Sequence, residues 1–192
     1  MIDALVVGLG NPGKEYARTR HNVGAEAVGL LVERGGGKFK AGRDKALVAD
    51  VTIAGRRVVL AFPTTFMNES GMAVGALMRR HKLEDPGQLI IVHDELDLPP
   101  GIMRVKVGGG LAGNNGLRSI TQHLKTSDYI RVRIGIGKPP SKERGADHVL
   151  SRLPKAEREL LDIAIVAAAD AVETLLAEGP NTAMTKFNAS PV

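Results

Sequence analysis

The sequence has 192 residues, of which 43% are hydrophobic and 24% are charged, a composition that excludes a disordered or fibrous chain. It contains no cysteine, which excludes disulfides and thiolate catalysis and favours a reducing compartment, the cytoplasm. The net charge of +5 suits a polyanionic partner, and no apolar stretch approaches the roughly 18 residues needed to cross a membrane. Because no basic segment precedes an apolar run at the N-terminus, we expect no secretory signal.

Short apolar segments alternate with segments of helical periodicity along the chain. We predict strands over Ala4–Val7, Ala46–Ile53, Arg57–Ala61, Gln88–Val92, Met103–Val107 and Ile130–Ile136. We predict helices over Asn22–Arg34, Glu69–His81, Leu117–Leu124 and Lys155–Ala177, the last of which closes the chain. The short turn Ala54-Gly55-Arg56 predicts that part of the sheet is antiparallel. The sequence therefore predicts an α/β fold with one domain over residues 1–192, in which helices flank both faces of a mixed, twisted sheet and the long C-terminal helix packs on it.

A glycine-rich turn follows the first predicted strand and leads to a histidine. The turn reads Gly8-Leu9-Gly10-Asn11-Pro12-Gly13, and His21 precedes the first predicted helix. The turn is similar to a dinucleotide-binding fingerprint, but Pro12 lacks the backbone N–H that a phosphate-binding loop would offer there. Binding crevices form where the strands of open α/β sheets end, so polar side chains here are well placed for chemistry.

A second polar segment follows the strand that ends at Val92. In an extended chain, His93 and Glu95 lie on one face, and Asp94 and Leu96 lie on the other. A carboxylate at this place can orient an imidazole from the first loop and raise its basicity, as a general base requires. A solvated turn and a metal site are the alternatives that the sequence leaves open.

Two asparagines, Asn68 and Asn115, each lie just before a predicted helix. Their position favours helix N-caps, and the alternative is that their amides bind a substrate carbonyl or a ribose hydroxyl. The neighbouring Phe66 and Met67 are interpreted as packing residues or as the floor of a pocket. The sequence has no nucleophile elbow, zinc-binding helix or Walker lysine, so a hydrolase of this sequence would use water activated by a His–Asp pair.

Basic residues gather on the later strands and on the connector Lys138–Gly145, which we interpret as a mobile lid. Arg131 and Arg133 share one face of their strand and predict either a solvated sheet face or a track for phosphates. Aromatic residues make up only 3% of the chain, which disfavours stacking on single-stranded bases as the main binding mode. A protein that reads nucleic-acid backbone and shape fits better.

Five motifs resemble, in order and spacing, those of the bacterial peptidyl-tRNA hydrolase family. They are Gly8-Leu9-Gly10-Asn11-Pro12-Gly13 with Tyr16 and Thr19-Arg20-His21-Asn22, then Met67–Gly71, His93–Pro99, Asn115–Ser119 and Arg131–Gly137. The resemblance covers nearly the whole chain. It implies a monomer without cofactor or metal that cleaves the ester bond between a peptide and the terminal ribose of tRNA, and so recycles tRNA from peptidyl-tRNA.

The resemblance also implies a role for individual residues. His21 is the general base, Asp94 holds it in its basic form, and Asn11 completes the catalytic group near the substrate. The implied contacts to the tRNA end or the peptide are Tyr16, Phe66, Met67, Asn68 and Asn115, and the implied contacts to tRNA phosphates are Lys106 and Arg133.

The sequence departs from the family pattern at two places. The usual Gly-His-Asn-Gly is Gly113-Asn114-Asn115-Gly116, and Phe62 replaces the lysine that usually precedes Pro63. Two other functions remain open at this point. One is a non-catalytic RNA-binding protein on the same fold, and the other is a nucleotide-binding α/β enzyme that uses the first glycine-rich turn.

Overall fold

The computed structural model describes residues 1–111 and 113–189, so Ala112 and the last three residues of the predicted domain lie outside the described residues. Within them the chain forms a seven-stranded sheet in the order β2-β3-β4-β1-β5-β7-β6. The strands are β1 (Ala4–Gly8), β2 (Lys40–Ala41), β3 (Ala46–Ile53), β4 (Arg56–Pro63), β5 (Leu89–Glu95), β6 (Met103–Val107) and β7 (Ile130–Gly135). The central strands β4, β1, β5 and β7 are parallel, whereas the β2–β3, β3–β4 and β6–β7 pairings are antiparallel. The predicted mixed sheet is confirmed.

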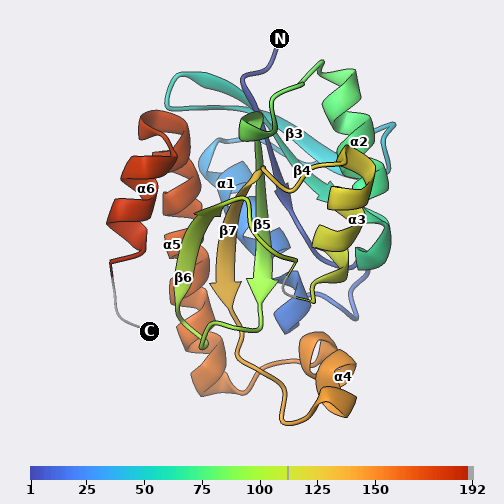
Figure 1. The fold of residues 1–192 in the computed structure, drawn as a ribbon, viewed down its shortest axis with the longest axis vertical. Helices are drawn as coiled ribbons and strands as arrows, with labels where there is room; N and C mark the ends of the chain where they lie inside the picture. The colour runs from blue at the N-terminus through green and yellow to red at the C-terminus, as the bar shows by residue number, and fades with distance from the viewer. Residues whose placement is uncertain (112, 190–192) are drawn as a thin grey trace.

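Helices cover both faces of this sheet, as predicted (Figure 1). One face packs against α1 (Val23–Arg34), α5 (Lys155–Glu178) and α6 (Pro180–Phe187), and the other packs against α2 (Ser70–Arg80) and α3 (Asn115–Leu124). The short helix α4 (Gly145–Leu150) lies beyond the carboxyl ends of β5 and β7. Four 3-10 turns complete the described elements: Arg20–Asn22, Met67–Glu69, Pro86–Gln88 and Lys142–Arg144.

The apolar run of β1 supplies both layers of the core. All five of its residues are buried, and Val6 packs in the cluster under α1 and α5 while Leu5 and Val7 pack in the cluster under α2 and α3. Successive side chains of a strand point to opposite faces, so a strand covered on both faces is apolar at every position. This is why β1 and β5 could be recognised as short continuous apolar runs.

Gly24 allows α1 to lie directly on β5. A Cβ at this position would lie 2.2 Å from the backbone oxygen of Val92, so a larger residue would push the helix away. The 3-10 turn that contains His21 runs straight into α1. Close packing of α1 on β5 therefore brings His21 to the carboxyl end of β5.

The turns of the chain agree with the predictions in part. β3 and β4 form the predicted antiparallel hairpin, and its two turn residues, Ala54 and Gly55, both have positive φ. The predicted long C-terminal helix is confirmed as α5, but it does not close the chain, because α6 follows it. Gly179, at φ +89°, ends α5, and Pro180 then occupies the first turn of a new helix, where a proline is favoured. The connector Lys138–Gly145 contains a 3-10 turn and leads directly into α4, and its role as a mobile lid stays a prediction.

Among the described residues, no helix has both the length and the apolar character that spanning a membrane requires.

Candidate active site

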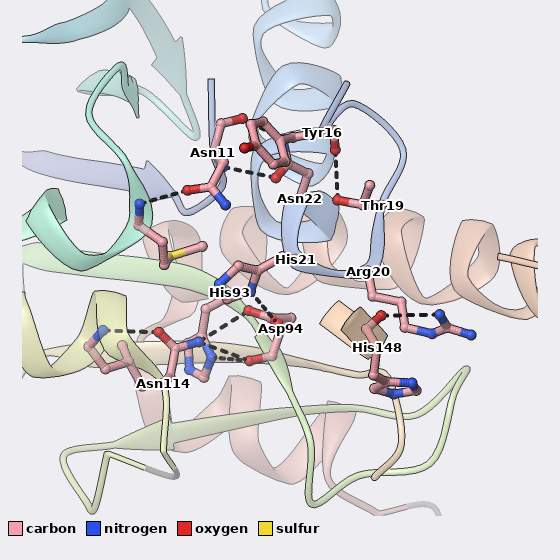
Figure 2. A network of polar contacts seen from close by, with 12 residues as sticks. Asn11, Tyr16, Thr19, Arg20, His21, Asn22, His93, Asp94, Asn114 and His148 are labelled. Carbon is pink, nitrogen blue, oxygen red and sulfur yellow. Dashed lines mark hydrogen bonds and ion pairs between the residues drawn. The ribbon is translucent and has the colours of Figure 1, made fainter. Parts of the chain in front are cut away.

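His21 and Asp94 are in contact at the carboxyl end of β5. His21 Nδ1 lies 2.7 Å from Asp94 Oδ2, and Asp94 lies between His21 and Asn114 (Figure 2). The His21 side chain is 12% exposed and the Asp94 side chain 3%. Because a carboxylate only accepts hydrogen bonds, Nδ1 carries the hydrogen and Nε2 keeps its lone pair. This is the tautomer that can take a proton from water.

Two opposing effects set the basicity of His21. Burial disfavours the charged imidazolium, but the negative charge of Asp94 and its hydrogen bond favour it. The pKa of His21 is raised above its ordinary value as the net result. Asp94 therefore makes the imidazole a stronger base than a free histidine.

The polar segment after Val92 belongs to β5. His93, Asp94 and Glu95 are all buried and continue the strand, so the alternative of a solvated turn is wrong for these three residues, whereas Asp97 lies exposed in the turn that follows. His93 Nδ1 donates to the backbone oxygen of Asp94 at 2.7 Å, and burial lowers the pKa of His93. In residues 1–111 and 113–189, no three His, Asp or Glu side chains are grouped so that they could hold a metal ion.

A cavity of about 240 Å³ opens beside the pair. Asp94 and Leu96 line it while His93 and Glu95 do not, which confirms the predicted division of this segment into two faces. The lining combines polar side chains with small or apolar residues, of which the last three belong to α4: His21, Asp94, Leu96, Gly113, Asn114, Asn115, Gly145, Ala146 and Val149. A bound molecule would thus meet amides and the imidazole on one side and α4 on another.

Asn11 holds the glycine-rich turn in place. Its backbone N–H donates to Asn22 Oδ1 at 2.9 Å, and its backbone oxygen accepts from Asn22 Nδ2 at 2.9 Å. Its side-chain Oδ1 accepts from the backbone N–H of Met67 at 2.7 Å. Because Oδ1 is engaged, the NH₂ of Asn11 is the part of this side chain that can serve a substrate. Next to it, the rings of Tyr16 and Phe66 pack edge to face, with their centroids 6.4 Å apart.

Comparisons of the whole chain with known proteins identify its family. Residues 5–192 match the family model described as peptidyl-tRNA hydrolase. The chain belongs to the peptidyl-tRNA hydrolase family. It is 49% identical to the peptidyl-tRNA hydrolase of Frankia alni, over 96% of this chain and 93% of that protein. It is 48% identical to the enzyme of Rhodococcus erythropolis, over 96% and 97% of the two chains.

The fold of the peptidyl-tRNA hydrolase family is equally clear in three dimensions. A crystal structure of peptidyl-tRNA hydrolase from Acinetobacter baumannii superposes with a TM-score of 0.92 at 41% sequence identity. The match covers 98% of this chain and 97% of that chain. The seven-stranded sheet described above, with its helices on both faces, is thus the peptidyl-tRNA hydrolase fold.

The N-cap interpretation of Asn68 and Asn115 is wrong in this member of the peptidyl-tRNA hydrolase family. Asn114 is the cap of α3, since its Oδ1 accepts from the backbone N–H of Leu117 at 3.1 Å. Asn115 is the first residue of that helix and lines the cavity, whereas Asn68 lies exposed within a 3-10 turn and caps nothing. Both amides therefore remain free for binding, as the alternative interpretation required.

The two arginines of β7 have different surroundings. Arg131 is buried and donates to the backbone oxygens of Gly109 and Gly110, so the predicted phosphate track does not include it. Arg133 donates from Nε to Glu95 Oε1 at 2.9 Å, and Lys106 on the neighbouring strand is exposed. The basic side chains available on these strands for a phosphate track are thus fewer than the sequence suggested.

Arg20 is a structural residue that the sequence analysis did not single out. Its guanidinium forms two hydrogen bonds with Glu157 at 3.1 and 2.9 Å and donates to Ser151 Oγ at 2.5 Å. These contacts tie the turn that carries His21 to the junction of α4 and α5. No local pattern could have found this, because the partners lie more than a hundred residues away in the chain.

Proposed function

We propose that this protein hydrolyses the ester bond between a peptide and the terminal ribose of tRNA. The observation that carries the proposal is the His21–Asp94 pair beside the amide-lined cavity, in a chain of the peptidyl-tRNA hydrolase family. The raised pKa of His21 supports its role as a general base. The product would be a tRNA with a free terminal ribose, ready to be charged again.

The proposed reaction needs only water and the side chains of the chain. His21 Nε2 takes a proton from a water molecule as the water oxygen bonds to the ester carbonyl carbon. The tetrahedral intermediate then collapses, the bond from carbon to the ribose oxygen breaks, and the ribose oxygen receives the proton from His21. Asp94 stabilises the imidazolium that exists between the two proton transfers, because its carboxylate accepts from Nδ1.

Amides and cations would position the substrate. Asn115 at the cavity and the exposed Asn68 are the candidates to polarise the ester carbonyl, and the NH₂ of Asn11 would donate to the same substrate. Tyr16, Phe66 and Met67 would contact the tRNA end or the peptide. Lys106 and Arg133, on adjacent strands, would neutralise tRNA phosphates.

We further infer that the protein acts as a monomer in the cytoplasm, without a cofactor or a metal ion. The reaction as derived involves no redox change, and peptidyl-tRNA arises where translation takes place. Size-exclusion chromatography and activity in the presence of a chelator test the two physical parts of this inference. A dimer in solution, or loss of activity with the chelator, would contradict them.

The test is hydrolysis of N-blocked aminoacyl-tRNA by the purified protein and by His21→Ala. We expect the variant to lose about 10²–10⁴-fold in rate while it still binds tRNA, because it lacks only the base. His81→Ala, at the end of α2, is the matched control and should keep the wild-type rate. Binding without hydrolysis by the wild-type protein would instead favour the non-catalytic RNA-binding function.

A further inference from the structure

The side chain of Asn114 connects α3 to the catalytic pair. Its Oδ1 accepts from the backbone N–H of Leu117 at 3.1 Å, and its Nδ2 donates to Asp94 Oδ1 at 3.1 Å (Figure 2). A backbone N–H can only donate, so the amide oxygen must face the helix. The NH₂ group must therefore face Asp94, and capping of α3 fixes which end of the amide the carboxylate meets.

As a result, the two oxygens of Asp94 have different donors. Oδ1 accepts from Asn114, and Oδ2 accepts from His21 at 2.7 Å. The backbone oxygen of Asp94 is held as well, by Nδ1 of His93. The carboxylate is thus fixed on both sides, in a line of hydrogen bonds that runs from α3 through Asn114 and Asp94 to His21.

We propose that Asn114 is a positioning residue of the hydrolytic site: its amide holds the carboxylate of Asp94 in the orientation in which it meets Nδ1 of His21 and so fixes the tautomer of the general base. The inference rests on the proposed function for its kinetic consequence. An amide does not ionise, so Asn114 supplies this hydrogen bond at every pH.

The other ionisable groups around the pair are engaged elsewhere, so among the described residues Asn114 is the side chain that holds Asp94 Oδ1. Glu95 of β5 pairs with Arg133 of β7, and Arg20 pairs with Glu157 of α5. The remaining ionisable neighbours are His93, His148 and Arg131. His93 donates to the backbone oxygen of Asp94, and His148 of α4 contacts the backbone oxygen of Gly137. Arg131 donates to the backbone oxygens of Gly109, Gly110 and Ser127.

Exchanging the side chains of Asp94 and Asn114 tests the line of hydrogen bonds from α3 to His21. In Asp94→Asn, the oxygen of the new amide accepts from Asn114, so its NH₂ faces His21 Nδ1. The imidazole must then accept at Nδ1 and carry its hydrogen on Nε2, which removes the lone pair that takes the proton from water. In the double variant Asp94→Asn/Asn114→Asp, the carboxylate at position 114 cannot donate. The NH₂ at position 94 turns to it, and the oxygen at position 94 faces His21 again.

The experiment compares kcat and KM of the wild type, both single variants and the double variant on N-blocked aminoacyl-tRNA. Asp94→Asn should lower kcat by about 10²–10⁴-fold. The double variant should regain about tenfold over Asp94→Asn, since one well-placed hydrogen bond is restored, while KM changes little. The melting temperature should stay close to that of Asp94→Asn, because aspartate caps a helix as well as asparagine does.

Two further variants separate positioning from helix capping. Asn114→Ser keeps the cap but is too short to donate to Asp94, so we expect a lower kcat in a protein that stays folded with α3 capped. Ser119→Ala is the matched control on the same helix, because it removes the hydrogen bond from the backbone N–H of Gly71 without touching Asp94. This control should keep the wild-type kcat.

The tautomer of His21 can be read without any substrate, from the imidazole ¹⁵N chemical shifts of the free proteins. We expect hydrogen on Nδ1 in the wild type, on Nε2 in Asp94→Asn and on Nδ1 again in the double variant. If these three tautomers are found but the wild-type protein does not hydrolyse the substrate, the positioning role is supported and the proposed function is contradicted. The inference would be overturned by two results together. The double variant would have the same kcat and the same His21 tautomer as Asp94→Asn, and Asn114→Ser would have the wild-type kcat. Asn114 would then be a helix cap only.

Discussion

The ion pair between Arg20 and Glu157 should contribute strongly to the stability of this fold. It joins the residue next to His21 to α5, with side chains that are 9% and 23% exposed. In Glu157→Gln, the amide can accept from only one nitrogen of the guanidinium, and the buried positive charge loses its counter-ion. Breaking a fully buried pair from one side costs about 3–5 kcal/mol. Because water reaches Glu157, we expect about 2–3 kcal/mol here.

This loss should appear as a melting temperature lower by about 4–12 °C, given about 2–4 °C per kcal/mol for a chain of this size. Urea unfolding provides the free energy directly, from a lower midpoint at an unchanged slope. The matched control is Asp170→Asn, which weakens the contact to Arg34 between side chains that are 50% and 34% exposed. That variant should cost about 0–1 kcal/mol.

Glu157→Gln should also slow hydrolysis under conditions in which the variant is fully folded. Arg20 holds the turn of His21 against Ser151 and Glu157, so its loosening displaces the base from the substrate. We expect kcat of Glu157→Gln to fall while Asp170→Asn stays at the wild-type rate. Equal unfolding free energies for the two variants would refute the reasoning, since burial is the feature that distinguishes the two pairs.

Three other predictions concern pH and salt. Asp94→Asn should move the acid limb of the pH–rate profile to lower pH, because the charge and hydrogen bond that raise the pKa of His21 are lost; a limb at the wild-type position would contradict this. Burial lowers the pKa of His93. In acid the unfolded protein therefore takes up a proton at this residue that the native protein does not, and the free energy of unfolding falls below about pH 6.5. His93→Asn should therefore reduce the loss of unfolding free energy between pH 7 and 5, measured by urea unfolding, and an equal loss in both proteins would argue against it. Lys106→Ala should reduce the slope of log affinity for tRNA against log salt by about 1, and an unchanged slope would remove Lys106 from the phosphate contacts.

Local patterns sufficed for most elements of the fold. β3 and β6 have the predicted bounds, because each is a continuous apolar or alternating run between turn residues. The helix α6 was missed because Gly179-Pro180 is equally suited to ending one helix and beginning another. The short helix α4 was missed because a polar, proline-containing connector has no apolar periodicity to reveal it.

The sequence by itself determined the alternation of strands and helices, the likeness to the peptidyl-tRNA hydrolase family, and the pairing of a histidine with an aspartate as the basis of the site. Those properties depend on residue type and spacing along the chain. Only the tertiary structure decided which groups hold that pair, because Asp94 lies 73 residues from His21 and 20 residues from Asn114 along the chain. It also decided that Arg131 is a buried structural residue and that Asn114, rather than Asn115, caps α3. Burial and hydrogen-bond geometry arise only when distant segments pack together, and no local pattern contains them.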